Sequence, residues 1–154
     1  MTQENKELLL KDLCARLPYD VKCYIPRAND TSILAAVLRD GKNTLFNFWE
    51  DSRTIQDWYQ LYISEFKPYL FPLSSMTDEQ CEELSNLIHE HFTLDDEFSE
   101  GIRFKTYGDI LVWFNEKPIN ECYFIFDYFN KNHFDYRGLI QKGLAIDALS
   151  KNIY

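Results

Sequence analysis

Residues 32–49, SILAAVLRDGKNTLFNFW, decide the fold class of this chain. The run SILAAVLR is apolar at almost every position, which is typical of a central strand whose two faces are both covered. Asp40 and Gly41 follow it, and this dipeptide between two strand-forming runs is a strong hairpin pattern. The stretch therefore predicts two antiparallel strands joined by a tight turn.

The register of this hairpin predicts which of its faces is buried. A two-residue turn at Asp40 and Gly41 sets smaller side chains against large ones on one face, which favours packing in the core. The pairs on this face are Ile33 with Phe48, Ala35 with Phe46 and Val37 with Thr44. The pairs on the other face are Leu34 with Asn47 and Leu38 with Asn43. Each of the latter sets an apolar side chain against an amide, so we expect that face to be partly wet.

Other segments predict further strands of the same sheet. VKCYI (21–25) alternates apolar and polar side chains, as a half-buried strand does. DWYQLYI (57–63) predicts a fourth strand, and IRFKTY (102–107) and DILVWFN (109–115) predict two more. KPYLFPLSS (67–75) contains two prolines, which cannot donate to a ladder. We therefore expect it to be an extended connection and not an inner strand.

Four segments predict helices: 4–16, 78–92, 119–131 and 136–142. The sequence TDEQ at 77–80 is a capping box, which fixes the start of the second helix. The apolar stripes expected to be buried are Leu9, Leu10, Leu13, Cys14 and Leu17 in the first helix, Cys81, Leu84, Leu87, Ile88 and Phe92 in the second, and Cys122, Ile125, Phe126 and Phe129 in the third.

Together these elements predict an α+β fold. Its antiparallel sheet would have four to six strands, packed with about four helices in a single domain over residues 1–154. A chain of this length buries roughly 68–70% of its unfolded surface, which is enough for a core without disulfides or metals. For residues 93–114 the sequence leaves strand and helix open.

The segment HFDYRGLIQKG (133–143) places a histidine, an aspartate, a tyrosine and an arginine within five residues. Asp135 is a good helix N-cap, and Phe134 and Leu139 stand at the two positions of a hydrophobic staple. These features predict a short structural helix over 136–142.

The end of this segment supports the same interpretation. Gly143 suits the left-handed residue that follows a helix, and Leu144 after it can contact Leu139 as a Schellman motif requires. The residue types also leave open a ligand-binding cluster. Its members would be His133, Asp135 and Arg137.

The search for chemistry finds no catalytic motif. No G-x-S-x-G, P-loop, G-x-G-x-x-G or H-E-x-x-H pattern occurs. The four cysteines stand alone, so neither a zinc site nor a redox pair is indicated. His89 and His91 lie about 200° apart around the predicted helix and cannot share a metal. We therefore assign no catalytic residue, cofactor or metal ligand and expect the protein not to be an enzyme.

The acidic residues are concentrated in one segment. The formal net charge is −9, and residues 77–100 carry nine acidic side chains and no lysine or arginine. The lack of a basic stripe argues against direct nucleic-acid binding. The segment is either a solvated helix face or a docking face for a basic partner. The side chains predicted for this interaction surface are Glu82, Glu83, Glu90, Asp95, Asp96 and Glu97.

Aromatic and basic side chains suggest a second kind of site. Aromatic residues at strand spacing belong most often to the core. On a wet sheet face, however, a tryptophan can stack on a base while an arginine holds a phosphate, and only a few local charges are needed. The residues predicted for this small nucleotide pocket are Arg39, Trp49, Trp58 and Arg103.

Three stretches carry a family resemblance: KELLLKDLCARLPYDVKC (6–23), KPYLFPLSSMTDEQ (67–80) and NHFDYRGLIQKGLAIDA (132–148). Together they resemble small uncharacterised proteins encoded by Bacteroidetes phages, prophages and mobile elements. The chain departs from that family at Asn132, where the family usually has a second histidine, and at Asp20, where it often has glycine. The resemblance carries over no catalytic residue. It implies an accessory protein that acts in the bacterial cytoplasm.

Three functions follow as hypotheses. The first is a non-enzymatic phage or mobile-element accessory protein that binds a host or phage protein. The second is an anti-defence protein that binds and sequesters a nucleotide signal, and the third is an acidic mimic of nucleic acid. The N-terminal MTQENKELLLKDL lacks the apolar core of a signal peptide, and no stretch is long enough to span a membrane. We therefore expect the protein in the host cytoplasm.

Overall fold

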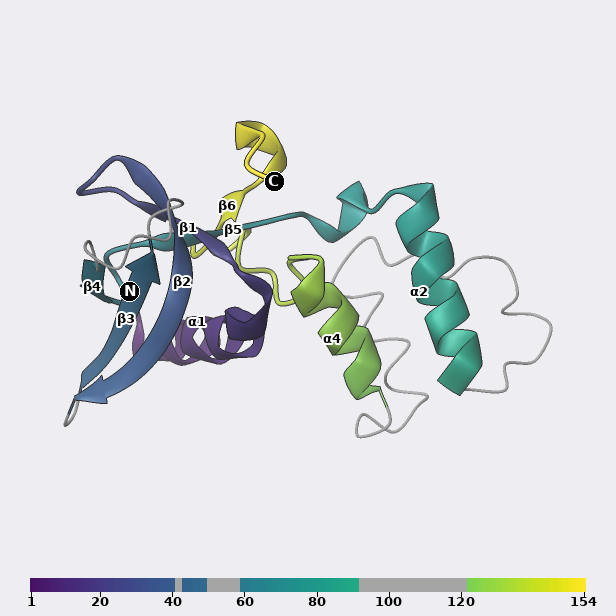
Figure 1. Ribbon diagram of the computed structural model, residues 1–154, viewed down its shortest axis with the longest axis horizontal. Helices are drawn as coiled ribbons and strands as arrows, with labels where there is room; N and C mark the ends of the chain where they lie inside the picture. The colour runs from purple at the N-terminus through teal and green to yellow at the C-terminus, as the bar shows by residue number, and fades with distance from the viewer. Residues whose placement is uncertain (41–42, 50–58, 92–121) are drawn as a thin grey trace. The chain divides into compact units, whose positions relative to one another are not determined.

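The computed structural model groups the chain into two compact units (Figure 1). The residues that it describes are 1–40, 43–49, 59–91 and 122–154. Unit 1 is Met1–Leu70 together with Leu139–Tyr154, and unit 2 is Phe71–Gly138. The helices and strands, in chain order, are α1 (Gln3–Arg16), β1 (Lys22–Ile25), β2 (Asp30–Asp40), β3 (Asn43–Trp49), β4 (Tyr59–Tyr62), β5 (Lys67–Leu70), α2 (Asp78–His91), α4 (Tyr123–Lys131) and β6 (Ile146–Asp147). The single-domain organisation stays a prediction.

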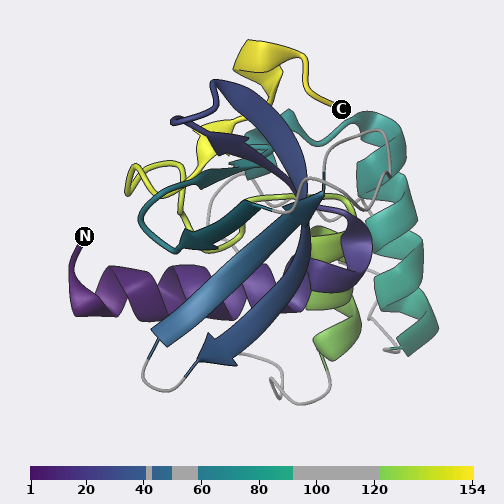
Figure 2. The same ribbon diagram turned by 60° about the vertical axis from the view of Figure 1, so that its left-hand side comes forward.

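Unit 1 is built on a six-stranded sheet in the order β4-β3-β2-β1-β5-β6. Neighbouring strands are antiparallel except for β5 and β6, which are parallel. Helix α1 packs on one face of the sheet, and Figure 2 shows it running beneath β2 and β3. This arrangement confirms the predicted α+β fold with a mostly antiparallel sheet. Three of the four predicted helices are present among the described residues, as α1, α2 and α4.

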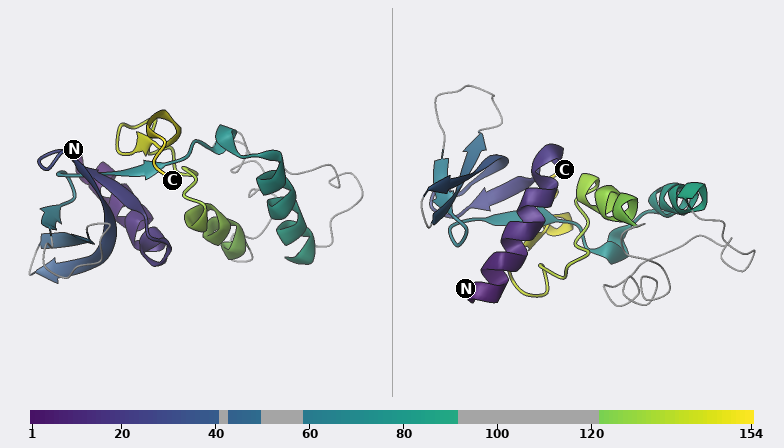
Figure 3. Two further views of the ribbon diagram at one scale, coloured as in Figure 1. Left: turned by 45° about the horizontal axis from the view of Figure 1, so that its top comes forward. Right: turned by 90° about the horizontal axis from the view of Figure 1, so that it is seen from below.

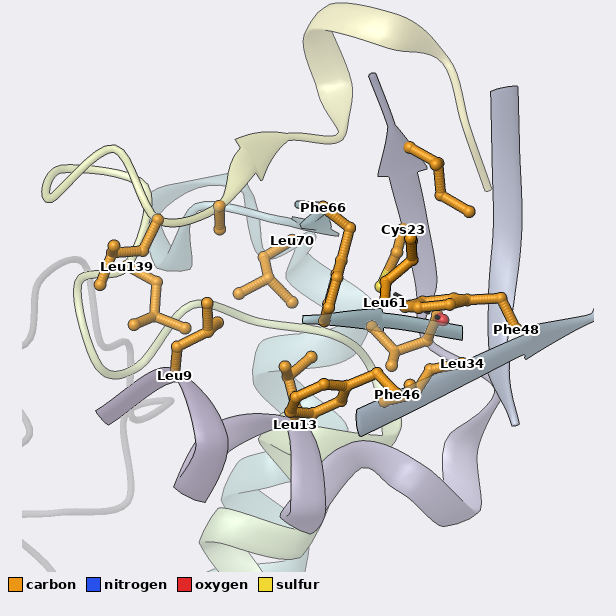
Figure 4. Close-up of a cluster of buried hydrophobic side chains, with 14 residues drawn as sticks. Leu9, Leu13, Cys23, Leu34, Phe46, Phe48, Leu61, Phe66, Leu70 and Leu139 are labelled. Carbon is orange, nitrogen blue, oxygen red and sulfur yellow. Dashed lines mark hydrogen bonds between the residues drawn. The ribbon is translucent and has the colours of Figure 1, made fainter. Parts of the chain in front are cut away.

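Apolar side chains of α1 and the sheet form the core of unit 1 (Figure 4). Leu9 and Leu13 of α1 are fully buried, as the apolar stripe predicts. They belong to the same cluster as Phe46 and Phe48 of β3. The ring of Phe66 lies 5.1 Å from that of Phe46 and 4.7 Å from that of Phe48, in tilted and edge-on arrangements that favour aromatic contact.

Helix α1 also carries a buried ion pair that its apolar stripe does not predict. Asp12 and Arg16 are both fully buried, and two hydrogen bonds join them. Arg16 Nε donates to Asp12 Oδ2 at 2.7 Å, and Nη2 donates to Oδ1 at 3.1 Å. Cys14, which we predicted on the buried stripe, is exposed instead. Because a charge inside a core is tolerated only when it is paired, Asp12 and Arg16 depend on each other.

The predicted hairpin is present as β2 and β3, but its predicted register is wrong. Asp40 pairs with Asn43, so the strands join one residue later than predicted, and the register shifts between Leu34 and Ala36. A bulge there adds one residue to β2 and changes which side chains face the core. Leu34 consequently pairs with Phe48 and is buried, although we predicted it on the wet face.

The prediction that residues 67–75 cannot form an inner strand is also wrong. Their first four residues are β5, which has β1 on one side and β6 on the other. Lys67 and Pro68 pair with β1, whereas Tyr69 and Leu70 pair with β6. The Leu70 carbonyl oxygen accepts a hydrogen bond from the Ala148 N–H on the β6 side, so alternation turns the backbone groups of Pro68 to that side too, away from β1. Because β6 pairs only with Tyr69 and Leu70, the missing N–H of Pro68 interrupts neither ladder.

The other strand predictions have different outcomes. The strand expected over 21–25 is confirmed as β1, and the one expected over 57–63 is confirmed as β4. The strands expected over 102–107 and 109–115 lie outside the described residues, as does the undecided stretch 93–114.

Unit 2 contains α2 and α4, whose apolar faces share one core. Its buried members are Leu73, Met76, Cys81, Leu84, Ile88, Cys122, Phe124, Ile125, Tyr128, Phe129, Phe134 and Tyr136. The capping box of α2 is confirmed. The Gln80 N–H donates to Thr77 Oγ1 at 3.2 Å, and the Thr77 N–H donates to Gln80 Oε1 at 2.9 Å. The helix predicted over 119–131 is confirmed from Tyr123 onward, and Phe92 lies outside the described residues.

The helix predicted over 136–142 is wrong. Gly138 has a φ of 68°, in the left-handed region, and this conformation interrupts a right-handed helix. Asp135 consequently does not serve as an N-cap. Its N–H donates to the Phe71 carbonyl oxygen at 2.8 Å, while the Phe71 N–H donates to the His133 carbonyl oxygen at 2.9 Å. These bonds form a short parallel bridge within unit 2.

The predicted closing turn is confirmed even though the helix is absent. Gly143 has a φ of 67°. Its N–H donates to the Ile140 carbonyl oxygen at 3.0 Å, and the Leu144 N–H donates to the Leu139 carbonyl oxygen at 2.9 Å. These are the two hydrogen bonds of a Schellman motif. This turn of unit 1 is therefore closed by the same two hydrogen bonds that commonly end a helix.

Candidate functional site: an acidic groove between two helices

The two units differ sharply in charge. Unit 2 contains fourteen acidic and five basic residues, which gives the whole net charge of −9. Unit 1 contains eleven of each and is neutral. Long-range attraction of a cationic partner is therefore a property of unit 2.

A groove of 380 Å³ lies between α2 and α4 of unit 2. Figure 3 shows the two helices side by side in both views. The residues that line the groove are Glu83, Asn86, Leu87 and Glu90 of α2 and Phe124, Asp127, Tyr128 and Lys131 of α4. Three carboxylates thus face one ammonium group, above a floor that is largely apolar and aromatic.

Helical periodicity explains why these side chains gather. Glu83, Leu87 and Glu90 are spaced by four and three residues, so they lie along one face of α2. On α4, Asp127 and Lys131 follow Phe124 at intervals of three and four residues. One face of each helix therefore lines the groove, while the neighbouring faces supply the core.

Tyr128 holds the two walls of the groove together. Its hydroxyl lies 2.9 Å from the Gln80 carbonyl oxygen and 3.1 Å from Glu83 Oε2, and it can donate to both. Burial, followed by the hydrogen bond to Glu83 and the charge of that carboxylate, raises the pKa of Tyr128 above its ordinary value. The phenol therefore stays a donor, and Glu83 is fixed at the edge of the groove.

At the C-terminal end of α2, His91 packs against Phe124, one of the residues that line the groove. The ring of His91 is stacked on that of Phe124, with centroids 4.0 Å apart and planes 18° apart. His91 Nδ1 lies 2.9 Å from the Leu87 carbonyl oxygen. This contact fixes the Phe124 ring from one side, so the apolar floor is in place before any ligand arrives.

The lining suits a long cationic side chain. An arginine or lysine has an aliphatic stem that can cover Leu87 and Phe124, and a charged end that can reach Glu90 or Asp127. An aromatic floor adds attraction for the cation. The arrangement offers recognition, and it brings together no nucleophile with an activating base.

The structure describes three of the six residues predicted for the acidic interaction surface. Glu82, Glu83 and Glu90 are exposed on α2, and the last two line the groove. Asp95, Asp96 and Glu97 lie outside the described residues.

The residues of the predicted nucleotide pocket are not brought together where the structure describes them. Arg39 pairs with Thr44 near one end of the β2–β3 ladder, and Trp49 pairs with Ile33 at the other. Arg39 and Ile33 are six positions apart along β2, which corresponds to about 20 Å. Both side chains are exposed. The other two members, Trp58 and Arg103, lie outside the described residues.

The segment around His133 forms a buried polar network in unit 2. Tyr136 donates its hydroxyl proton to Asn130 Oδ1 at 3.1 Å and accepts a hydrogen bond from Arg137 Nη2 at 2.7 Å. The guanidinium of Arg137 also lies over the Tyr136 ring, 4.8 Å from its centroid. His133 and Asp135 are buried in the same segment. These contacts give Tyr136 and Arg137 a structural role in unit 2, although not as part of the predicted helix.

Sequence reasoning missed the α4 half of the groove. The predicted helix pointed to Phe126 and Phe129 as buried side chains, and no acidic cluster marks Asp127. Phe124, Asp127 and Lys131 do stand at helical spacing in the sequence. No local pattern shows, however, that they face residues of α2 that lie about 40 residues earlier in the chain.

Comparisons with known proteins identify no relative of this chain. Family models, curated proteins and solved structures were all searched, and none matches this chain. Among the described residues, no helix is both long and apolar enough to cross a membrane. That part of the chain also contains no group of three or more histidine, cysteine or acidic side chains placed to hold a metal ion.

Proposed function

We propose that the protein is a non-enzymatic binding protein whose α2–α4 groove receives a basic segment of a partner protein. The observation that carries this proposal is the lining of the groove. Glu83, Glu90 and Asp127 stand around an apolar and aromatic floor in a unit that holds the whole net negative charge. Charge attracts the partner and speeds encounter, whereas the floor selects a side chain with an aliphatic stem.

The walls of the groove support recognition without rearrangement. Tyr128 ties Glu83 to α4, and the His91–Phe124 stack holds the floor. A preorganised site loses less conformational entropy on binding, so more of the interaction energy contributes to affinity.

The biological setting that we propose is that of a phage or mobile-element accessory protein in a bacterial cytoplasm. The resemblance of residues 6–23, 67–80 and 132–148 to Bacteroidetes phage proteins supports this setting. The partner is then a host or phage protein that presents lysine and arginine next to apolar side chains.

The test is a binding measurement with two matched double variants. The probe is a fluorescent amphipathic peptide with arginine and lysine on one helical face and leucine on the other. Glu90→Gln with Asp127→Asn removes two charges inside the groove. Glu79→Gln with Glu82→Gln removes two exposed charges of α2 outside it. We expect the groove variant to weaken binding by about tenfold or more, and the control variant by much less.

Two outcomes would contradict the proposal. If the peptide does not bind the unmodified protein at low salt, the groove is not a site for a basic segment. Equal losses in both double variants would show that charge density alone attracts the peptide, as an acidic mimic of nucleic acid would predict.

A further inference from the structure

The two helices that form the α2–α4 groove run in opposite directions along it. Tyr128 contacts Glu83 in the first half of α2. Phe124, one turn earlier in α4, contacts His91 at the end of α2. The groove therefore has two distinct ends, a Glu83 end and a His91 end.

Charge is distributed unevenly between these two ends. Lys131 follows Tyr128 by three residues, so it lies at the Glu83 end. It is the only basic residue in the part of the groove lining that the structure describes. Glu90 directly precedes His91 and lies at the other end, where the described lining supplies no cation. The carboxylate of Glu90 therefore attracts an incoming cation to the His91 end.

His91 supplies a flat platform at this end of the groove. It follows Leu87, which lines the groove, by four residues, so the two side chains lie on the same face of α2. His91 Nδ1 donates to the Leu87 carbonyl oxygen at 2.9 Å, because a carbonyl can only accept. This hydrogen bond and the Phe124 ring together fix the plane of the imidazole.

Only one face of this platform is covered. Phe124 packs on one face of the imidazole, with centroids 4.0 Å apart and planes 18° apart. His91 is nevertheless an exposed residue, which leaves the opposite face of its ring for a ligand. A rigid ring with one open face, next to a carboxylate, suits a planar cation.

We infer that the His91 end of the groove is a subsite selective for arginine over lysine, an inference that rests on the proposed function of the groove. The guanidinium of the partner's arginine lies flat on the open face of the His91 ring and donates hydrogen bonds to the Glu90 carboxylate. Its aliphatic stem packs over Leu87.

The two basic side chains differ in the chemistry that this subsite uses. A guanidinium is planar, delocalised and weakly hydrated, so it can stack on a ring while its N–H groups donate in their own plane to a carboxylate. An ammonium group is compact and strongly hydrated, so it pairs with the carboxylate but gains less from the ring face. Both side chains therefore enter the groove, and the ring makes the difference between them.

The experiment uses the amphipathic peptide described above in three versions, whose cationic positions are all arginine, all lysine or all citrulline. Each is titrated into the intact protein at low salt. The arginine peptide should bind about tenfold more tightly than the lysine peptide. The citrulline peptide should bind most weakly, because citrulline is planar but carries no charge.

Two variants of His91 separate stacking from charge. His91→Ala removes the platform and should weaken binding of the arginine peptide about tenfold, to the affinity of the lysine peptide. His91→Phe keeps a flat ring and should keep the preference for arginine. Unchanged affinity for the lysine peptide in both variants shows that the groove is intact. Tyr62→Ala is the control, because it removes a 52% exposed ring from unit 1, and it should change neither affinity.

The outcomes distinguish the subsite from the groove itself. If none of the peptides binds the unmodified protein, the proposed function fails and the subsite fails with it. Equal affinities for the arginine and lysine peptides would keep the groove as a site for a basic segment and would overturn the subsite alone. A His91→Ala variant that retains the full preference for arginine would also overturn it.

Discussion

At the scale of single residues, polar groups of buried side chains in both units are paired with specific partners. Tyr128 contacts Gln80 and Glu83 with one hydroxyl, and Asp12 contacts Arg16 through two hydrogen bonds. The sequence predicted the helices that carry these residues but not the contacts. A tyrosine whose acceptors lie more than 40 residues away has no local pattern, and an aspartate four residues before an arginine is more often a surface pair.

Replacement of Tyr128 should weaken unit 2. Tyr128→Phe removes the hydroxyl from two part-buried acceptor contacts and should lower the free energy of unfolding by about 1–3 kcal/mol. Tyr123→Phe is the matched control on α4, because Tyr123 is 68% exposed and should tolerate the change. Denaturant unfolding of both variants measures the difference, and equal effects would contradict the role of Tyr128.

The same hydroxyl predicts a dependence on alkaline pH. Burial raises the pKa of Tyr128 in the folded protein, whereas the unfolded chain releases this proton near its ordinary value of about 10. The stabilisation is therefore fully present below pH 10 and is lost as the pH rises towards the folded pKa. The free energy of unfolding should fall above about pH 10, and less steeply in Tyr128→Phe. Parallel pH curves for the two proteins would refute this prediction.

The buried ion pair of α1 should respond strongly to loss of one partner. Asp12→Ala leaves the Arg16 guanidinium buried without its carboxylate and should cost about 3–5 kcal/mol. The double variant Asp12→Leu with Arg16→Met removes both charges and should recover much of that loss. Glu7→Ala on the same helix is the control, since Glu7 is exposed. Thermal and denaturant unfolding would show whether the single change is worse than the double one.

At the scale of elements, local patterns predicted which segments fold and tertiary pairing decided how they meet. The capping box of α2 and the apolar stripes of α1 and α4 were sufficient to predict those helices. The bulge at Ala35, the inner position of β5 and the absence of a helix over 136–142 were not predictable in this way. Each depends on a neighbouring strand or on one glycine with positive φ. For the same reason the sequence identified Glu83 and Glu90 but not their neighbours on α4.

The closing turn at Gly143 gives a test of backbone strain without side-chain crowding. Nothing lies within 4 Å of the position that a Cβ would take there, so only the φ of 67° opposes a larger residue. Gly143→Ala should destabilise the protein by about 1–2 kcal/mol, and Gly143→Asn by less, because asparagine tolerates the left-handed region. Equilibrium unfolding of the pair gives the answer. Equal costs would mean that the turn relaxes out of this conformation.

At the scale of the whole molecule, charge is distributed unevenly, with a neutral unit 1 and a unit 2 of net charge −9. Self-repulsion destabilises only the acidic unit and should decline as salt is added. Between about 0.01 M and about 1 M salt, the Debye length falls from about 30 Å to about 3 Å. Amide hydrogen exchange should then slow more in α2 than in α1. A similar change in both helices would show that the two units share their charge effects.

The parallel pair of β5 and β6 has a consequence for biosynthesis. Tyr69 is synthesised long before its ladder partner Ile146, and the whole of residues 71–138 is translated between them. At roughly 5–20 residues per second, the nascent chain exposes the unpaired side of β5 for roughly 4–15 seconds on the ribosome. An unpaired strand edge is prone to join other chains, so this interval is when chaperones would have most effect on the yield of folded protein.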